Sequence, residues 1–110
     1  MAVYTPKKLY SGQPTTSATT LYTAPASTST IVKNILMTNT TATDATITIS
    51  FVPSGGTAGA TNRVFTGYTV KANDTVAVDL SSVLSTSDFI SALQGTSGAI
   101  TIYISGVEVV

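Results

Sequence analysis

Residues 31–52 have the sequence IVKNILMTNTTATDATITISFV, and this stretch decides the fold. From Ala45 to Val52, apolar residues alternate with Thr and Ser, and this period of two is typical of a strand with one buried face. The polar segment from Asn39 to Asp44 separates this run from a first apolar run, Ile31 to Thr38, as loops between paired strands do. We therefore predict a β-hairpin at the centre of an all-β domain.

The first run of this hairpin is apolar on both faces. In a regular strand, Ile31, Ile35 and Met37 would point to one face, whereas Val32 and Leu36 would point to the other. A strand that is apolar on both faces is usually covered on both faces. In so small a domain, we expect the second cover to be another copy of the protein.

Further strands flank the predicted hairpin. Thr19 to Thr23 is a short strand, and Arg63 to Val70 and Thr75 to Leu80 are two longer ones. The segment Lys71 to Asp74 has the composition of a turn, so we expect the two longer strands to pair antiparallel across it. Gly67 interrupts the first of them and indicates a bulge or a close contact.

The last predicted strand runs from Ala99 to Val110. Its isoleucines, which end at Ile104, share one face, but Val107 and Val109 fall on the opposite face of a regular strand. A bulge at Ser105-Gly106 would restore the phase. An exposed apolar strand at the C-terminal end would promote aggregation, so we expect this strand to be paired in the sheet or at a subunit contact.

The two ends of the predicted domain differ in character. Residues 1–17 hold two prolines and a Ser/Thr cluster, and we expect an extended arm with a short strand at Lys8 to Ser11. Residues 18–110 form the single domain. Ser81 to Gly95 holds the one helical signal, in which Ser87 can cap a short helix and Gly95 follows its last turn. The predicted fold is an all-β antiparallel β-sandwich or jelly-roll-like barrel with one short helix.

The composition restricts the possible partners. Charged residues make up 9% of the chain, against roughly 25% in an average soluble domain. Five basic residues balance five acidic ones, so the formal net charge is zero. Such a surface suits a fixed assembly and lacks the basic patch that a nucleic-acid-binding protein needs. The N-terminal residues contain no long apolar run, so we expect no export signal and no membrane span.

The chain has few residues that can carry chemistry. It has no His and no Cys, which removes the common catalytic triads and most zinc sites. The segment Pro53 to Asn62 is rich in glycine but lacks the Lys-Ser or Lys-Thr of a phosphate loop. We expect no enzymatic activity, no cofactor and no metal. A spatial carboxylate pair is the residual alternative, and the carboxylates are Asp44, Asp74, Asp79, Asp88 and Glu108.

Aromatic and apolar residues are the remaining candidates for recognition. Tyrosine is enriched at interfaces because its ring is large and its hydroxyl tolerates water. For the tyrosines, packing within the sheet is the competing interpretation. The predicted subunit or assembly interface consists of Tyr4, Tyr10, Tyr22, Val32, Leu36, Phe65, Val109 and Val110.

Several segments together resemble small structural proteins of tailed bacteriophages. The similarity covers nearly the whole chain and consists of turn and strand signatures, not catalytic motifs. The segments are Leu9-Tyr10-Ser11-Gly12-Gln13, Leu21-Tyr22-Thr23-Ala24-Pro25-Ala26, Ile31-Val32-Lys33-Asn34-Ile35 to Asn39, Val52-Pro53-Ser54-Gly55-Gly56, Asn62-Arg63, and Ile104-Ser105-Gly106-Val107-Glu108-Val109.

The resemblance implies a non-enzymatic virion component that is assembled in the host cytoplasm. Such proteins are often trimeric and serve as head decoration (cement) proteins. The expected partners are other copies of the chain and virion proteins such as the major capsid protein, without nucleic acid or membrane. The alternative is a tail, baseplate or fibre-attachment protein that binds a glycan on the host surface. Exposed aromatic residues around the loop Gly55 to Thr61 would favour that alternative.

Overall fold

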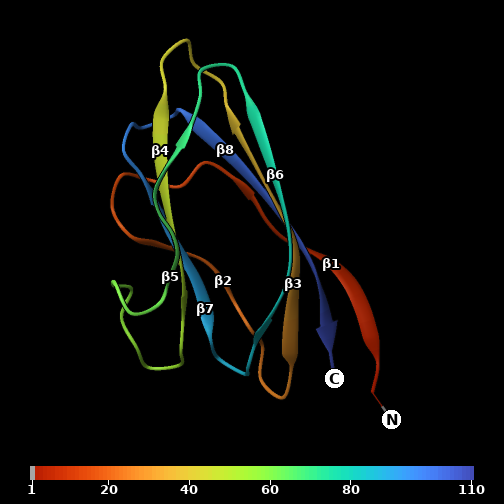
Figure 1. Ribbon diagram of the computed structural model, residues 1–110. Helices are drawn as coiled ribbons and strands as arrows, with labels where there is room; N and C mark the ends of the chain where they lie inside the picture. The colour runs from red at the N-terminus through yellow and green to blue at the C-terminus, as the bar shows by residue number, and fades with distance from the viewer. Residues whose placement is uncertain (1) are drawn as a thin grey trace.

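The computed structural model describes residues 2–110 and shows two four-stranded antiparallel sheets packed face to face (Figure 1). Sheet A has the order β1-β8-β3-β6, and sheet B has the order β2-β7-β4-β5. The all-β sandwich of the sequence prediction is therefore confirmed. The strands are β1 (Tyr4–Gly12), β2 (Thr19–Thr23), β3 (Ser29–Asn39), β4 (Ala45–Val52), β5 (Arg63–Val70), β6 (Thr75–Leu84), β7 (Phe89–Gln94) and β8 (Ile100–Val109).

The pairing pattern is that of a jelly roll. Strand β1 pairs with β8, β2 with β7, β3 with β6 and β4 with β5, so the chain folds back on itself as one long ribbon. That ribbon is rolled so that β3 also pairs with β8 and β4 with β7. Eight strands in two packed sheets define this architecture. Within residues 2–110, only the connection between β4 and β5 joins neighbouring strands of one sheet.

The predicted hairpin between residues 31 and 52 is wrong, because β3 lies in sheet A and β4 in sheet B. The buried side chain of Asn39 holds the crossing in place. Its amide nitrogen donates to the carbonyl oxygens of Thr43, at 2.8 Å, and Val70, at 3.0 Å, and its Oδ1 accepts from the Thr41 amide at 2.9 Å. The alternation of residues identified the buried face correctly, but it does not distinguish a hairpin from an arch between sheets.

The predicted pairing of Arg63–Val70 with Thr75–Leu80 is wrong for the same reason. Strand β5 belongs to sheet B and β6 to sheet A. Their connection lies against the first arch, since Asp44 Oδ1 accepts from the amide of Ala72 at 2.9 Å and the amide of Asn73 donates to the carbonyl of Thr41 at 3.0 Å. The two polar turns thus form one hydrogen-bonded end of the sandwich.

The predicted helix at Ser87 to Gly95 is also wrong, since Phe89–Gln94 is β7, an interior strand of sheet B. Ser87 has a left-handed φ of 70°, which a helix cap does not use. Asp88 accepts from the amides of Ser54 and Ser85, each at 2.9 Å, and so joins two loops. A six-residue apolar run is equally compatible with a buried strand, and its two neighbours, β2 and β4, decide the outcome.

The N-terminal segment is a longer strand than the predicted Lys8 to Ser11. Tyr4–Gly12 forms β1, which pairs with β8 along its length at the edge of sheet A. Beyond the strands, the amide of Val3 donates to the carbonyl of Val110 at 2.7 Å, and the amide of Val110 donates back to the carbonyl of Val3 at 3.0 Å. The two ends of the described chain therefore lie side by side (Figure 1).

The expected bulge at Ser105-Gly106 is wrong in its placement. Strand β8 is regular there, and the extra residues lie in its two neighbours, at Leu9 in β1 and Lys33 in β3. A Cβ atom on Gly106 would collide with the carbonyl oxygen of Ile31 and lie 2.9 Å from Leu9 Cδ1. The backbone of β3 and the Leu9 side chain of β1 thus come unusually close to Gly106, and the two flanking strands bulge beside it.

The core fills the space between the two sheets. It is dominated by isoleucines from the interior strands β3, β4, β7 and β8, together with smaller residues. The largest fully buried side chains are Ile35, Met37, Ile47, Ile49, Ile90, Ile100, Ile102, Ile104, Gln94, Val32, Val52 and Val70. The buried amide of Gln94 is satisfied, because it donates to the Pro14 carbonyl and its Oε1 accepts from the amide of Ile100 at 2.8 Å.

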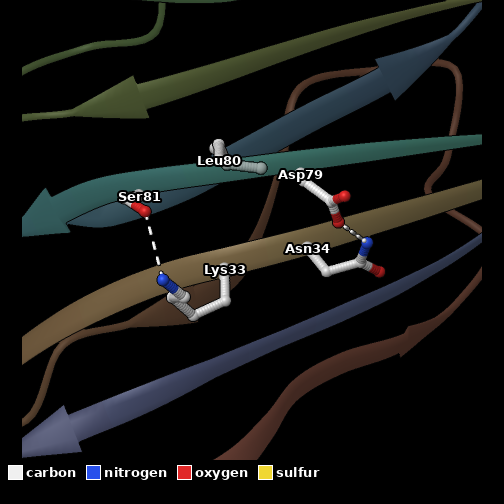
Figure 2. Close-up of a pocket in the computed structure, with 5 residues that line it drawn as sticks. All are labelled: Lys33, Asn34, Asp79, Leu80 and Ser81. Carbon is white, nitrogen blue, oxygen red and sulfur yellow. Dashed lines mark hydrogen bonds between the residues drawn. The ribbon is translucent and has the colours of Figure 1, made fainter.

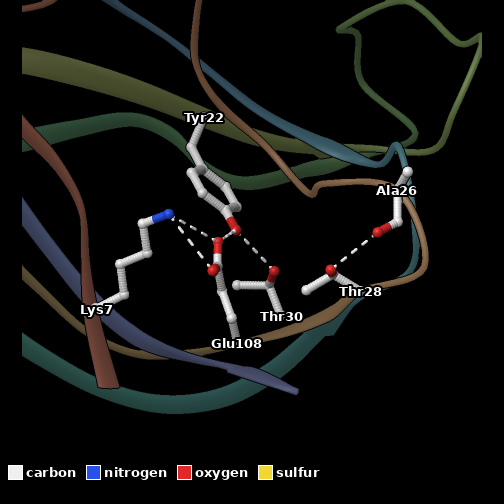
Figure 3. Close-up of polar contacts among 6 residues, drawn as sticks. All are labelled: Lys7, Tyr22, Ala26, Thr28, Thr30 and Glu108. Atoms are coloured by element: carbon white, nitrogen blue, oxygen red, sulfur yellow. Dashed lines mark hydrogen bonds and ion pairs between the residues drawn. The ribbon is translucent and has the colours of Figure 1, made fainter. Parts of the chain in front are cut away.

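A polar cluster connects the two sheets where the apolar core ends (Figure 3). The hydroxyl of Tyr22, on β2, donates to Glu108 Oε2 at 2.6 Å and lies 2.8 Å from Thr30 Oγ1. Lys7 Nζ forms an ion pair with the same Glu108 oxygen at 3.2 Å. The Tyr22 hydrogen bond, and then Lys7, hold the pKa of Glu108 below its usual 4.5 against partial desolvation. Burial, and then Glu108, raise the pKa of Tyr22 to about 12.

Gly106→Ala is expected to destabilise the fold by about 3 kcal/mol, because the new methyl group overlaps the backbone of β3 and cannot be relieved by a side-chain rotation. Urea denaturation monitored by circular dichroism measures the change. Gly59→Ala is the matched control, since its Cβ would meet only the carbonyl oxygen of Thr57 at 4.0 Å. Equal stability of the two variants would contradict the close approach at Gly106.

Tyr22→Phe is expected to lower the free energy of unfolding by about 2 kcal/mol near pH 7, because it removes a hydrogen bond to a carboxylate and one to a hydroxyl. Tyr103→Phe is the control, since that ring lies on the exposed outer face of sheet A. Urea titrations of both variants and the parent chain measure the difference. A loss no larger than that of the control would show that the cluster does not stabilise the fold.

The same cluster predicts a defined pH range of stability. The depressed pKa of Glu108 gives a contribution that is present above pH 4.5 and is lost as the pH falls through its folded-state value. The raised pKa of Tyr22 gives a contribution that is complete below pH 10 and is lost as the pH rises towards 12. The difference between Tyr22→Phe and the parent should therefore narrow at both extremes of pH, as measured by denaturation at a series of pH values.

Candidate interaction surface

The outer face of sheet A carries side chains in cross-strand rows, and one row is wholly apolar. Pro6 of β1 lies opposite Val107 of β8, which lies opposite Ile31 of β3, which lies opposite Val83 of β6. Residues that face each other across strands share one face of the sheet, so these four form a continuous strip. The buried Val32, next to Ile31, shows that the strip points away from the core.

The next row extends this strip to the end of the sheet. Tyr4 lies opposite Val109, and Val109 lies opposite Ser29. Tyr4 and Val83 are 66% and 62% exposed. The surface named here the end patch consists of Tyr4, Pro6, Ile31, Val83, Val107 and Val109. An apolar patch that crosses all four strands of a sheet is the kind of surface that meets another macromolecule.

A polar row bounds the end patch at the bulges. Lys8, Ser105, Asn34 and Asp79 lie opposite one another in turn. Beside them is a shallow depression lined by Lys33, Asn34, Asp79, Leu80 and Ser81 (Figure 2). Within it Lys33 Nζ donates to Ser81 Oγ at 3.1 Å, and Asn34 Nδ2 donates to Asp79 Oδ1 at 2.9 Å. Because these side chains are already paired with each other, the depression is a polar border of the patch and has no catalytic arrangement.

Beyond the polar row, the outer face becomes apolar again. Tyr103 of β8 lies opposite Leu36 of β3, which lies opposite Ala77 of β6. Tyr103 is 41% exposed and Leu36 36% exposed, although both belong to interior strands of the sheet. Within residues 2–110, these interior strands therefore present apolar side chains to solvent.

The residues predicted as an interface separate into two groups. Tyr4 and Val109 lie in the end patch, Val110 is exposed beside it, and Leu36 lies further along the same face. The other four pack inward. Val32 is fully buried in the core, and Tyr10, Tyr22 and Phe65 are partly buried residues that pack against the core. The ring centroid of Phe65 also lies 5.8 Å from that of Tyr68 at the edge of the sandwich.

The prediction from sequence did not include Pro6, Ile31, Val83 and Val107. A regular strand would place Ile31 with the core residues and Val32 on the other face, but the extra residue at Lys33 reverses the phase of β3 on one side of the bulge. Val107 carried a usable signal, since it lies an odd number of residues from Ile104 and therefore faces outward in a regular strand. The outer position of Val83 follows only from its register against Ile31.

The outer face of sheet B is different in character. Thr48 and Ser50 of β4 and Ser91 of β7 lie there beneath Ala58 and Gly59 of the long loop, around a cavity of about 40 Å³. The loop is held by its own hydrogen bonds, from the amide of Gly59 to Asn62 Oδ1 and from Asn62 Nδ2 to the carbonyl of Thr57, both at 3.0 Å. This face therefore carries hydroxyl side chains beside Arg63 and Leu93 and is partly covered by the loop.

Residues 2–110 contain no cluster of three or more His, Cys, Asp or Glu side chains that would hold a metal ion. In the same residues, no helix has the length and apolar character needed to cross a membrane. Among the features described above, the end patch is the arrangement best suited to contact another macromolecule.

Among known proteins, this chain is similar to solved structures in its fold, but its sequence matches no family model and no curated protein. A solved chain from the study "Bacillus endospore appendages form a novel family of disulfide-linked pili" is similar over 97% of this chain and 86% of its own length, with a TM-score of 0.57 and 16% identity.

Two chains of infectious bursal disease virus have the same fold. One is from the "T13 IBDV viral particle", with a TM-score of 0.55, 17% identity and 98% of this chain covered; the other is from the Gx strain, with a TM-score of 0.51, 15% identity and 99% covered. This chain spans 30% and 37% of those viral chains. Its fold therefore resembles that of chains from a virus particle and from disulfide-linked pili.

Proposed function

We propose that this protein is a non-enzymatic structural component of a bacteriophage virion, a decoration (cement) protein that binds and stabilises the head shell. The observation that carries the proposal is the end patch, an apolar strip across all four strands of sheet A. A single copy leaves this strip in water, and association with a neighbouring subunit would bury it.

The charge of the chain supports a place in a fixed assembly. Zero formal net charge gives copies little electrostatic repulsion, so they can pack closely. A standard interface buries about 800 Å² on each partner, and repetition around a shell multiplies modest contacts into high avidity. The fold similarity to a virus-particle chain agrees with this role.

Three copies are the oligomeric state that the resemblance to phage proteins implies, and we retain a homotrimer as part of the proposal, with the major capsid protein as the second partner. A three-fold assembly needs two different surfaces that fit each other. The end patch is suitable as one of them. The similar Bacillus endospore appendages are disulfide-linked pili, but this chain has no cysteine, so its copies would associate through non-covalent contacts.

The glycan-binding tail alternative has less support. The loop Gly55 to Thr61 contains no aromatic residue. Of the nearest aromatic pair, Phe65 packs against the core, and Tyr68, which is 38% exposed, belongs to β5 and not to the loop. A glycan-binding surface on this loop would need exposed rings, and the outer face of sheet B presents hydroxyls instead. A glycan array without hits would remove this alternative.

Tyr4→Lys tests the end patch. The ammonium group would have to be desolvated in the assembled interface, so we expect binding to phage heads and self-association to weaken at least about tenfold. The stability of the fold should change by less than about 0.5 kcal/mol, since Tyr4 is 66% exposed. Light scattering measures self-association, and cosedimentation with heads of the phage that encodes the chain measures binding.

Val64→Lys is the matched control, because Val64 is another exposed apolar strand residue but lies on β5 of sheet B. We expect it to bind like the parent chain. A parent protein that is strictly monomeric and has no affinity for phage particles would contradict the proposed function. Equal effects of the two substitutions would show that the end patch is not the contact surface.

A further inference from the structure

The sandwich has four edge strands, and three of them carry features that block pairing with another chain. Strand β1 contains Pro6, Lys7 and Lys8 and the extra residue Leu9. Strand β2 has five residues and a register shift. Strand β5 begins with Arg63 and is interrupted by register shifts and the left-handed Gly67. Proline, lysine, short length and bulges are the usual means of protecting a sheet edge.

The first half of β6 has none of these features. Thr75 to Asp79 pairs with β3 without a register shift, and it contains no Pro, Gly, Lys or Arg. The described residues place no strand on its other side, because β6 is the edge of sheet A. This segment therefore offers a row of backbone groups in regular register, without the features that protect the other edges.

The hydrogen bond from the amide of Asn39 to the carbonyl of Asp74, at 2.9 Å, identifies which groups are free. It marks Asn39 and Asp74 as a hydrogen-bonded pair, and such pairs alternate along an antiparallel ladder. Val76 and Val78 therefore bond to β3. The amide and carbonyl groups of Thr75, Ala77 and Asp79 point instead to the open side.

We propose that two copies of this chain pair antiparallel through Thr75 to Asp79, around a two-fold axis at Ala77, to form a continuous eight-stranded sheet. In this register Ala77 lies opposite Ala77 of the second copy, and Thr75 lies opposite Asp79 on each side of the axis. The three pairs form about six backbone hydrogen bonds, two for each closely bonded pair. All the free groups of the segment are then satisfied.

In this register, the side chains of one copy fit the side chains that they face on the second copy. The smallest residue lies at the axis, where the strands meet. On the outer face, each Asp79 carboxylate meets a Thr75 hydroxyl. On the inner face, the half-buried Val76 of one copy meets the half-buried Val78 of the other. Both side chains also pack against the apolar core of their own copy. Cross-strand pairs of these kinds stabilise a sheet.

Electrostatics selects this register over its neighbour. With the axis at Ala77, the two Asp79 residues are four positions apart along the strands, about 14 Å at 3.4 Å per residue. Screening at physiological salt acts over about 8 Å, so their repulsion is weak. With the axis at Asp79, the two carboxylates would lie directly opposite each other, which is destabilising. The single acidic group of this segment therefore favours the register centred on Ala77.

The pairing is a weak contact by itself, because a five-residue strand pair buries far less than the roughly 800 Å² per partner of a standard interface. The β6 pairing would add a second contact to the proposed self-assembly, and its physiological role rests on that proposed function. The paired segment Thr75 to Asp79 and the end-patch residue Val83 lie in different halves of β6, so a two-fold contact here is compatible with a three-fold contact elsewhere.

Ala77→Cys gives a direct test, because the chain has no other cysteine. Opposed Cα atoms in a hydrogen-bonded pair lie about 5.5 Å apart, within the range that a disulfide spans. We expect mild oxidation of the folded protein to give a covalent dimer, read by non-reducing electrophoresis. Ser11→Cys is the matched control, since Ser11 lies in the same cross-strand row at the guarded edge, β1, and it should crosslink at least about tenfold more slowly.

Ala77→Lys provides a second measurement on the uncrosslinked protein. It places two ammonium groups opposite each other at the axis and leaves the pairing with β3 intact, so circular dichroism should be unchanged. Sedimentation velocity should show at least about a tenfold weaker dimer than the parent, whereas Ser11→Lys should not. Crosslinking of Ala77→Cys no faster than of Ser11→Cys would overturn the pairing. If the parent still forms oligomers in that case, the proposed function stands without it; a monomeric parent without affinity for phage heads would contradict both.

Discussion

The structure depends on the close approach of the β3 backbone and the Leu9 side chain to Gly106 of β8. Because no side chain projects there, β3 can lie against β8, and both neighbours of β8 absorb the approach by taking in one extra residue, Leu9 on one side and Lys33 on the other. The bulges change the phase of β1 and β3 but leave β8 regular. They thereby determine which residues point into the core and which form the end patch.

Most of the strands and the all-β class could be predicted from the sequence, but the partner of each strand could not. The period-two alternation of Ala45 to Val52 predicted a strand with its isoleucines buried, and that is confirmed, as is the all-β class. Partner choice could not be predicted, because a polar turn such as Asn39 to Asp44 has the same composition in a hairpin and in an arch. The buried Asn39 amide donates to the carbonyl of Val70 in the other sheet and so stabilises the arch, but this contact is visible only in the structure.

The candidate surface was partly predictable for a related reason. The phase of Val107 and Val109 against Ile104 was visible in the sequence, but the expected bulge at Ser105-Gly106 would have returned both to the face of the isoleucines, whereas β8 is regular and leaves them on the outer face. The roles of Ile31 and Val32 were interchanged, because a bulge at a lysine leaves no mark in a hydrophobic pattern. Phe89 to Gln94 was mistaken for a helix because short apolar runs lack a decisive period, and its neighbours in sheet B determine its conformation.

The position of β8 has a consequence for biosynthesis. It follows the other seven strands in the sequence, yet it lies between β1 and β3 in the interior of sheet A. The first strand therefore has no partner while the ribosome is still translating the middle of the chain, and sheet A closes only after residues 100–109 have emerged. Long-range pairing of this kind makes folding slow. A copy whose translation stopped before β8 would lack the central support of sheet A, so β1 would have no partner strand.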